Sequence, residues 1–188
     1  MSSVLAPGST IDADNLDFNT RGGFDIVGDQ DGPNVVFLAE DGSENLGDDF
    51  IIGGFADDTL STGAGDDILA TGAGEDFIIG GDGTDVIRGG EGDDVIIGGA
   101  GADIMSGGGG SDLFILSGED FAAGEKDVIQ DFTVGHDELL INGVSEDASV
   151  SYHAATGNVT VGDQVVARLD PNLDVTVDQL DDDTWQLF

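Results

Sequence analysis

Residues 80–97 read Gly-Gly-Asp-Gly-Thr-Asp-Val-Ile-Arg and then Gly-Gly-Glu-Gly-Asp-Asp-Val-Ile-Ile, two copies of one nine-residue unit. The unit is Gly-Gly-x-Gly-x-Asp-x-U-x, where U is a large apolar residue, and it keeps its phase through residues 44–118. Its aspartates are Asp49, Asp58, Asp67, Asp76, Asp85, Asp94, Asp103 and Asp112. The apolar residues are Ile51, Leu60, Leu69, Ile78, Ile87, Ile96, Met105 and Phe114. A disordered glycine-rich tract or a solvated acidic surface would not hold this phase.

The spacing predicts a solenoid with two sheets. Each unit offers one extended segment of about three residues around U. The glycines between these segments reach the positive φ values that tight turns require. Strand, turn, strand and turn then form one coil of two units, with U pointing inward from both sheets. Each strand should pair with the strand two units later.

Stacked coils place the carboxylates in two columns, one along each loop edge. Carboxylates about 4.8 Å apart, one strand spacing, repel each other unless a cation lies between them. Hard oxygen donors in glycine loops with many backbone carbonyls favour Ca²⁺ over Mg²⁺ or Zn²⁺. The columns are Asp49, Asp67, Asp85 and Asp103 on one edge, and Asp58, Asp76, Asp94 and Asp112 on the other.

The unit is similar to the calcium-binding repeat of the RTX (repeats-in-toxin) family, and the resemblance covers all the repeats. It implies an all-β fold, a right-handed parallel β-roll with an N-terminal cap and an antiparallel C-terminal β cap. It also implies about six Ca²⁺ ions. In that family each ion lies between two loops of one edge. The earlier loop supplies its second and fourth carbonyls and its Asp, and the later loop supplies its first and third carbonyls and its Asp.

Carried onto this chain, the resemblance implies a set of metal ligands in every loop of the array. Thr62 and Thr71 replace the first glycine and Ala56 replaces the third, so we expect weaker sites near the N-terminal end. The expected ligands are Asn45, Gly47, Asp49, Gly54, Ala56, Asp58, Thr62, Gly63, Ala64, Gly65, Asp67, Thr71, Gly72, Ala73, Gly74, Asp76, Gly80, Gly81, Asp82, Gly83, Asp85, Gly89, Gly90, Glu91, Gly92, Asp94, Gly98, Ala100, Asp103, Gly107, Gly109 and Asp112.

Residues 1–43 are predicted to form an irregular lead, residues 1–20, followed by a degenerate capping coil, residues 21–43. Gly23-Phe24-Asp25-Ile26-Val27 and Gly32-Pro33-Asn34-Val35-Val36 both repeat Gly-x-Asp/Asn-x-U, which places Val27 and Val36 at U. A solenoid end needs such a closing element. An ordinary hairpin explains the same residues equally well.

Residues 119–188 are predicted to form a C-terminal β cap and a candidate secretion signal. The segments 127–132 and 135–141 resemble the part that follows the repeats in RTX proteases and lipases, where it extends and closes the roll. Alternating apolar residues at 150–153, 159–161 and 164–169 indicate antiparallel strands, with Gly157-Asn158 as a turn. The acidic and then apolar residues 181–188 resemble an RTX export signal, although a docked strand explains them as well.

The composition limits the partners. There are 40 acidic residues against 4 basic ones, a formal charge of −36, which excludes nucleic acid as a direct partner. No segment is long and apolar enough for membrane insertion, and the N-terminus lacks the pattern of a signal peptide. The resemblance therefore implies an extracellular protein exported by the type I secretion machinery.

Catalytic patterns are missing from the sequence, so we expect no enzyme. Neither His-Glu-x-x-His nor a lipase nucleophile elbow occurs, and there is no cysteine. His136 and His153 are expected to be surface or cap residues. Paired acids such as Asp57-Asp58 fit loop ligands and solvated charge better than acid–base catalysis, because neighbouring side chains point to opposite faces.

The residues that flank U should point outward, and many are apolar. A patch of this size seldom stays exposed on a monomer. We favour cover by residues 1–43 or 119–188, and self-association through this face is the alternative. The outward residues are Thr59, Phe77, Val95, Leu113, Ser61, Ile79, Ile97 and Ile115 on one sheet, and Phe50, Ile68, Val86 and Ile104, with Arg88 and Ser106, on the other.

Three functions are consistent with the sequence. The first is a secreted, non-enzymatic calcium-binding protein that folds when it meets Ca²⁺ outside the cell. The second is a self-assembling subunit of an extracellular matrix, surface layer or adhesin. The third is an accessory C-terminal module of an RTX protease, lipase or polysaccharide-modifying enzyme.

Overall fold

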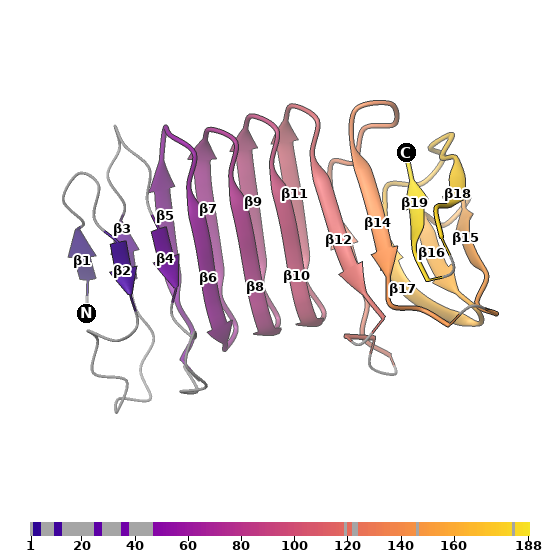
Figure 1. The fold of residues 1–188 in the computed structure, drawn as a ribbon, viewed down its shortest axis with the longest axis horizontal. Helices are drawn as coiled ribbons and strands as arrows, with labels where there is room; N and C mark the ends of the chain where they lie inside the picture. The colour runs from indigo at the N-terminus through magenta and orange to yellow at the C-terminus, as the bar shows by residue number, and fades with distance from the viewer. Residues whose placement is uncertain are drawn as a thin grey trace.

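The computed structural model describes residues 2–4, 10–12, 25–27, 35–37, 47–118, 120–121, 124–145, 147–181 and 183–188. These residues form a roll of two sheets that face each other (Figure 1). The β-roll architecture predicted from the nonapeptide period is confirmed. None of the described segments is a helix with the length and apolar character required to cross a membrane.

The first sheet has ten strands in the order β1-β3-β5-β7-β9-β11-β13-β17-β16-β15. Its strands are β1 Ser2–Val4, β3 Asp25–Val27, β5 Phe50–Gly54, β7 Ile68–Ala73, β9 Val86–Glu91, β11 Ile104–Gly109, β13 Asp127–Ile129, β15 Val150–His153, β16 Asn158–Val161 and β17 Gln164–Arg168.

The second sheet has nine strands in the order β18-β19-β14-β12-β10-β8-β6-β4-β2. Its strands are β2 Thr10–Asp12, β4 Val35–Phe37, β6 Thr59–Ala64, β8 Phe77–Gly83, β10 Val95–Gly101, β12 Leu113–Ser117, β14 Glu138–Asn142, β18 Val177–Gln179 and β19 Trp185–Leu187.

Strands of the array pair in parallel with a shift of two units, as predicted. Ile96 pairs with Ile78 on one side and with Phe114 on the other. The strands are longer than the predicted three residues, because the glycine loops pair as well: Gly99 lies opposite Gly81 and Ala100 opposite Asp82. Gly81 and Gly99 have φ values of 121° and 104°, so the loop backbones stack at ladder spacing without side-chain obstruction.

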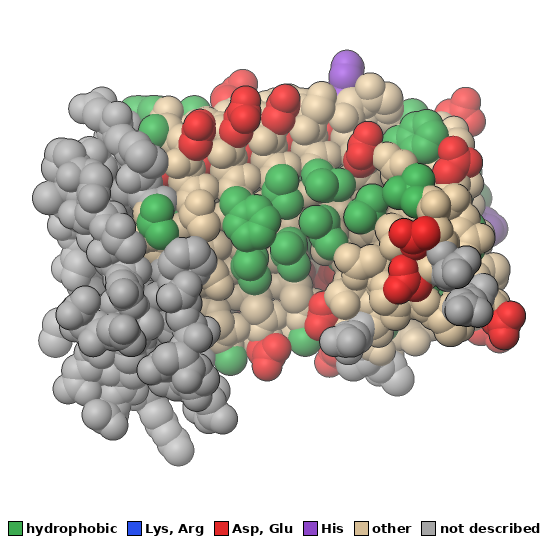
Figure 2. All heavy atoms as spheres, in the orientation of Figure 1, with side chains coloured by type: hydrophobic (Ala, Val, Ile, Leu, Met, Phe, Trp, Pro, Cys, Tyr) green, Lys and Arg blue, Asp and Glu red, His purple; other side chains and the backbone are tan. Residues whose placement is uncertain are grey.

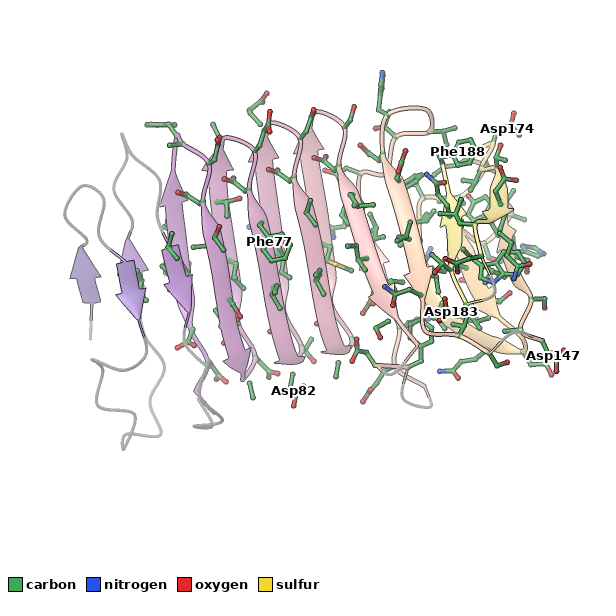
Figure 3. All side chains as sticks on the ribbon, in the orientation of Figure 1. Phe77, Asp82, Asp147, Asp174, Asp183 and Phe188 are labelled. Carbon is green, nitrogen blue, oxygen red and sulfur yellow. The ribbon has the colours of Figure 1, made fainter. Side chains whose placement is uncertain are left out.

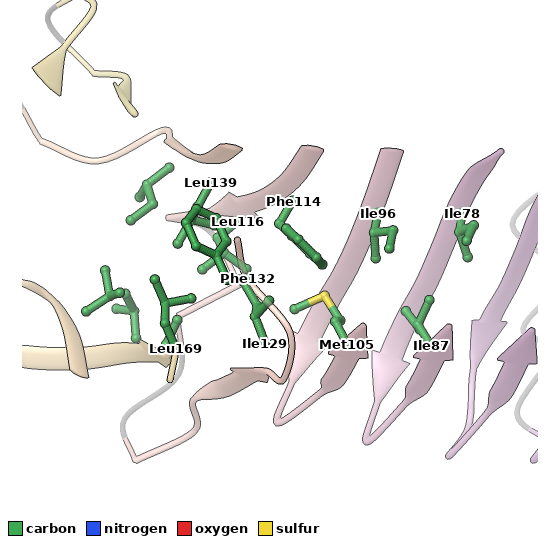
Figure 4. Packing of buried hydrophobic residues seen from close by; sticks show 14 of the residues in the cluster. Ile78, Ile87, Ile96, Met105, Phe114, Leu116, Ile129, Phe132, Leu139 and Leu169 are labelled. Carbon is green, nitrogen blue, oxygen red and sulfur yellow. The ribbon is translucent and has the colours of Figure 1, made fainter. Parts of the chain in front are cut away.

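The apolar U residues form the core between the two sheets (Figure 4). Ile78, Ile87 and Ile96 are completely buried, and the line of packing continues through Met105 and Phe114. Side chains two residues apart share a face of a strand, which explains why one apolar residue per unit is enough for this narrow interior.

At the N-terminal end the roll continues beyond the array. β3 pairs in parallel with β5, and β4 pairs with β6, so residues 25–27 and 35–37 belong to different sheets and the hairpin alternative is wrong. The phase predicted for residues 23–27 is also wrong: Ile26, not Val27, lies opposite Ile51 and is buried. β1 and β2 add to the same sheets, although residues 1–20 were expected to be irregular.

The C-terminal strands continue both sheets before the strand direction reverses. β13 and β14 pair in parallel with β11 and β12 and form another coil. β16 pairs antiparallel with both β15 and β17, and β19 pairs antiparallel with β14 and β18, as predicted for the cap. Residues 185–187 are therefore a docked strand, with Leu187 completely buried.

The described part of residues 119–188 does not cover the outward apolar residues, whereas most of residues 1–43 lie outside the described residues, so cover by that segment stays a prediction. Residues 119–188 extend the sheets at one end, and Phe50 and Ile68, on the outward side of the first sheet, are 40% and 41% exposed, while Phe77, on the outward side of the second sheet, is 37% exposed. Figure 2 shows hydrophobic side chains gathered in the middle of one face, between acidic side chains along its borders. Figure 3 places Phe77 on this face.

Candidate metal sites along the two loop edges

The eight repeat aspartates lie in two buried columns, one on each loop edge. Each is 3% exposed or less. Within a column the Oδ1 atom of each Asp accepts a hydrogen bond from the backbone N–H of the Asp one coil earlier. The donor–acceptor pairs are Asp49–Asp67 and Asp58–Asp76 at 2.7 Å, Asp67–Asp85, Asp76–Asp94 and Asp85–Asp103 at 2.9 Å, and Asp94–Asp112 at 3.0 Å.

The second carboxylate oxygen, Oδ2, is buried without a hydrogen-bond partner in six of these aspartates. A buried carboxylate oxygen without a donor or a cation is costly, about 1–3 kcal/mol or more. These oxygens are therefore the strongest structural indication that the loop edges bind a cation. They belong to Asp67, Asp76, Asp85, Asp94, Asp103 and Asp112.

In two rungs the Oδ2 atom lies near the following coil. At Gly80, an added Cβ atom would meet Asp85 Oδ2 and would lie 2.7 Å from the carbonyl oxygen of Gly98, one coil later. The same convergence occurs at Gly89, where Asp94 Oδ2 and the Gly107 carbonyl oxygen meet. The side chains of Asp85 and Asp94 thus accept a hydrogen bond from the previous coil through Oδ1 and place Oδ2 near a backbone carbonyl oxygen of the following coil.

Burial disfavours the charged form of these carboxylates. It raises the pKa of Asp85 and Asp94 to about 7, against an ordinary value of 3.8, and the neighbouring column carboxylates add to the rise. Burial also raises the pKa of Asp67, and the hydrogen bond from the Asp49 N–H partly counteracts this rise. Without a cation, the ionised columns therefore oppose folding near neutral pH.

Calcium suits these edges. The donors are hard oxygens, and the flexible, oxygen-rich coordination of Ca²⁺ accepts backbone carbonyls readily. Among the described residues, no group of three or more His, Cys, Asp or Glu side chains is placed to hold a metal. A cation at the columns must therefore take most of its ligands from backbone carbonyls, as the RTX pattern implies.

The predicted carbonyl ligands lie beside the columns. The third-position carbonyls of Asp82 and Gly109 accept the N–H groups of Gly65 and Gly92 at 2.9 and 2.7 Å, and each carbonyl retains a second lone pair. The hydroxyls of Thr62 and Thr71 donate to the first-position carbonyls of the following coil. Asn45 lies outside the described residues. Coordination by the backbone positions stays a prediction.

A second, exposed ladder of hydrogen bonds runs outside each column, and no pattern in the sequence predicts it. The carboxylate of Asp48 accepts the N–H of Asp66, and that of Asp66 accepts the N–H of Thr84. On the other edge Asp57 accepts from Glu75, and Asp93 from Ser111. These acids precede the column aspartates and bind forward along the roll, so they join neighbouring loops through hydrogen bonds.

The columns also continue beyond the array, which the sequence reading missed. Asp127 Oδ1 accepts the N–H of Asp103, and Asp137 Oδ1 accepts that of Asp112, both at 3.0 Å. Both carboxylates are buried. The signal was the local Asp-x-U pattern at Asp127 and Asp137, each followed two residues later by a buried apolar residue, out of phase with the array.

The two histidines are exposed, as predicted. His136 is solvent-exposed in a turn, and His153 Nδ1 contacts the Thr156 hydroxyl at 3.2 Å. Neither residue lies in a column.

The structure combines two parallel sheets, inward aliphatic residues and stacked loops with buried carboxylates. This combination is that of a cation-binding β-roll. Residues 45–78 and 79–114 match the family model described as RTX calcium-binding nonapeptide repeat (4 copies). The array therefore consists of RTX calcium-binding repeats. A comparison with curated proteins gives no match.

Proposed function

We propose that this chain is a secreted, non-enzymatic calcium-binding protein whose roll forms when Ca²⁺ enters the loop edges outside the cell. The main support is the set of six buried Oδ2 atoms without partners, two of which, in Asp85 and Asp94, lie near a backbone carbonyl oxygen of the following coil. We propose about six ions, each between two consecutive aspartates of one column. The formal charge of −36 adds repulsion that would keep the metal-free chain expanded.

Calcium concentration can then act as the folding signal. Extracellular modules often bind Ca²⁺ with dissociation constants of roughly 10⁻⁴–10⁻³ M, well above cytosolic concentrations. A ligand that binds only the folded state stabilises it by mass action. The chain would stay expanded during export by a type I system and fold afterwards.

Circular dichroism during a calcium titration tests this proposal. We expect a coil at micromolar Ca²⁺ and a cooperative gain of β-structure at millimolar Ca²⁺, with Mg²⁺ at the same concentration giving much less. The single Trp185 lies in β19, so its fluorescence reports docking of the cap in the same titration. A β spectrum that persists in excess chelator contradicts calcium-driven folding.

Self-assembly through the outer face is a second candidate. It is favoured by the exposure of Phe77 on the outward side of the second sheet, at 37%, and of Phe50 and Ile68 on the outward side of the first sheet, at 40% and 41%, with no described segment over them. Light scattering with and without Ca²⁺ tests it, and Ile79→Asp with Ile97→Asp should abolish any assembly. A holo form that is strictly monomeric at high concentration excludes this candidate.

A further inference from the structure

The outer face of the first sheet carries two arginines. Arg88 of β9 pairs with Ser106 of β11, and Arg168 of β17 pairs with Val128 of β13. Both arginines are exposed, and the residue before each, like Met105 before Ser106, is buried, so both side chains point outward. Of the three basic residues in the described part of the chain, two therefore lie on one sheet face.

Neither arginine forms an ion pair among the described contacts, although the chain has 40 acidic residues. The carboxylate of Asp131, beside Ser106, is held by the Ser106 hydroxyl and the Gly107 N–H. Asp170 is exposed in the turn beyond β17 and borders a hollow with Arg168, but no described contact joins the two side chains. Both guanidinium groups can therefore receive a carboxylate from another molecule.

The outer face of the second sheet carries the opposite charge. Glu138 of β14 is exposed and precedes the buried Leu139, so it points outward. Asp178 of β18 is also exposed, and it lies in one cross-strand row with Gln186 and Leu140. Around the apolar patch, Figure 2 shows acidic but no basic side chains among the described residues in view. The apolar residues of this face are Phe77, Ile79, Val95, Ile97, Leu113 and Ile115.

The strand order places the opposite charges at the same level of the roll (Figure 1). β17 follows β13 in the first sheet, and β19 follows β14 in the second, so Arg168 lies level with β19. The strands on either side of β19 are β14, with Glu138, and β18, with Asp178. Arg88 lies in β9, directly after β8, which carries the 37% exposed Phe77.

Two copies in the same orientation, with the first sheet of one on the second sheet of the other, would bring these groups together. Arg168 would meet the carboxylates of Glu138 and Asp178, and Arg88 would meet the ring of Phe77, a favourable cation–π partner. A two-fold contact would instead place arginines against arginines or carboxylates against carboxylates, which disfavours it.

We propose that the partner of these faces is a second copy of the chain, with the first-sheet face of one roll on the second-sheet face of the next. Such a head-to-tail contact leaves one face of each kind exposed at the ends, so it continues into an open-ended stack. The inference rests on the proposed calcium-dependent folding, because only the folded roll has these faces, and it specifies the contact for the second candidate function.

The size of the faces indicates a weak association. Seven strands spaced by about 4.8 Å, with about six flat residues each, give a face of roughly 600 Å² per partner, the lower limit for specific interfaces. The formal charge of −36 also opposes approach, and salt screens this repulsion beyond about 8 Å at physiological ionic strength. We therefore expect stacks only in Ca²⁺ and at high protein concentration.

Sedimentation velocity of the full-length chain in millimolar Ca²⁺, over a range of protein concentrations, tests the stack with two charge-reversal variants. The first is Arg88→Glu with Arg168→Glu, and the second is Glu138→Arg with Asp178→Arg. Each variant alone has like charges on both faces and should stay monomeric where the wild type associates. An equimolar mixture restores opposite charges at every contact and should associate as the wild type does.

The control is Asp147→Arg with Asp163→Arg, which makes the same charge change as the second variant in exposed turns. It should associate at least as well as the wild type, because its net charge is less negative. If net charge alone governed association, the second variant would also associate more than the wild type, which would overturn the proposal. A mixture as monomeric as its components would overturn it as well.

Circular dichroism of the same samples separates this inference from the proposed function. A wild type that is folded in Ca²⁺ but strictly monomeric overturns the stack and leaves calcium-driven folding intact, whereas a wild type that does not respond to Ca²⁺ refutes the proposed function itself. If a double variant does not fold, Arg168→Glu and Asp178→Arg are tested singly and mixed, with smaller effects expected in the same direction. Unchanged association of these single variants refutes the proposal.

Discussion

Replacement of Asp85 by Asn separates the two roles of the column carboxylates. The Asn side chain keeps an oxygen that accepts the Asp67 N–H, now bonded at 2.9 Å to Asp85. Its amide replaces the unpartnered Oδ2 and can donate to the nearby Gly98 carbonyl. The variant thus loses a calcium ligand and a buried charge but retains the hydrogen bond that joins the coils.

The magnitude follows from the cost of that buried charge. A pKa raised from 3.8 to about 7 corresponds to about 4 kcal/mol of destabilisation above pH 7, since one pH unit is worth about 1.4 kcal/mol. The cost of a buried polar atom without a partner gives a lower figure of about 1–3 kcal/mol. Asp85→Asn should therefore stabilise the metal-free roll by about 1–4 kcal/mol and at the same time weaken its response to calcium.

Two titrations followed by circular dichroism measure these opposite effects. In chelator, the variant should fold at a lower concentration of a stabilising osmolyte than the wild type. In calcium, its folding midpoint should move less with concentration. Asp82→Asn is the matched control, because it removes the same charge from an exposed position of the same loop (Figure 3). Identical behaviour of the two variants refutes the reasoning.

Three further predictions concern the loops, the core and pH. Gly108→Ala should strongly raise the Ca²⁺ concentration at the folding midpoint, because φ of Gly108 is 105° and the new Cβ would meet the Gly90 carbonyl oxygen. Gly109→Ala is the control and should be nearly neutral, because its new Cβ would meet only the end of the Glu91 side chain, at 3.1 Å. Ile96→Ala should lower the free energy of unfolding of the calcium-bound protein by about 2–5 kcal/mol, measured by thermal unfolding, because Ile96 is completely buried. Ile97→Ala, on the outer face, should lower it by less than about 1 kcal/mol. Equal losses would contradict the assignment of the core. In chelator, acidification from pH 8 towards 4 should promote folding, because the raised pKa of Asp85 and Asp94 means that the folded form binds protons more tightly. In calcium the same acidification should raise the Ca²⁺ concentration at the folding midpoint, since protons compete with Ca²⁺ for the carboxylate ligands. Loss of β-structure on acidification in chelator would contradict this prediction.

The array was predictable because its period fixes the register. A strict nine-residue repeat allows Ile96 to pair only with residues two units away, and that is what the sheets show. The length of the strands was underestimated because the sequence shows glycines as turns, whereas Gly81 and Gly99 both turn and pair.

The ends of the roll were harder to predict because the period breaks there. Ile26 and Val27 are both apolar, so the local pattern could not decide which one points inward. Asp127 is separated from Asp103 by 24 residues and Asp137 from Asp112 by 25, so a search at the repeat period does not find them. The outer ladder of Asp48 and Asp66 depends on stacking in three dimensions and has no mark in a single unit.

The central claim is that calcium ions between successive coils neutralise the aspartate columns and hold them together. Anomalous diffraction from crystals grown in calcium-rich buffer tests it most directly. The account predicts anomalous peaks along both loop edges, between consecutive column aspartates such as Asp67 and Asp85. Edges that remain empty in saturating calcium, with the roll intact, would contradict it.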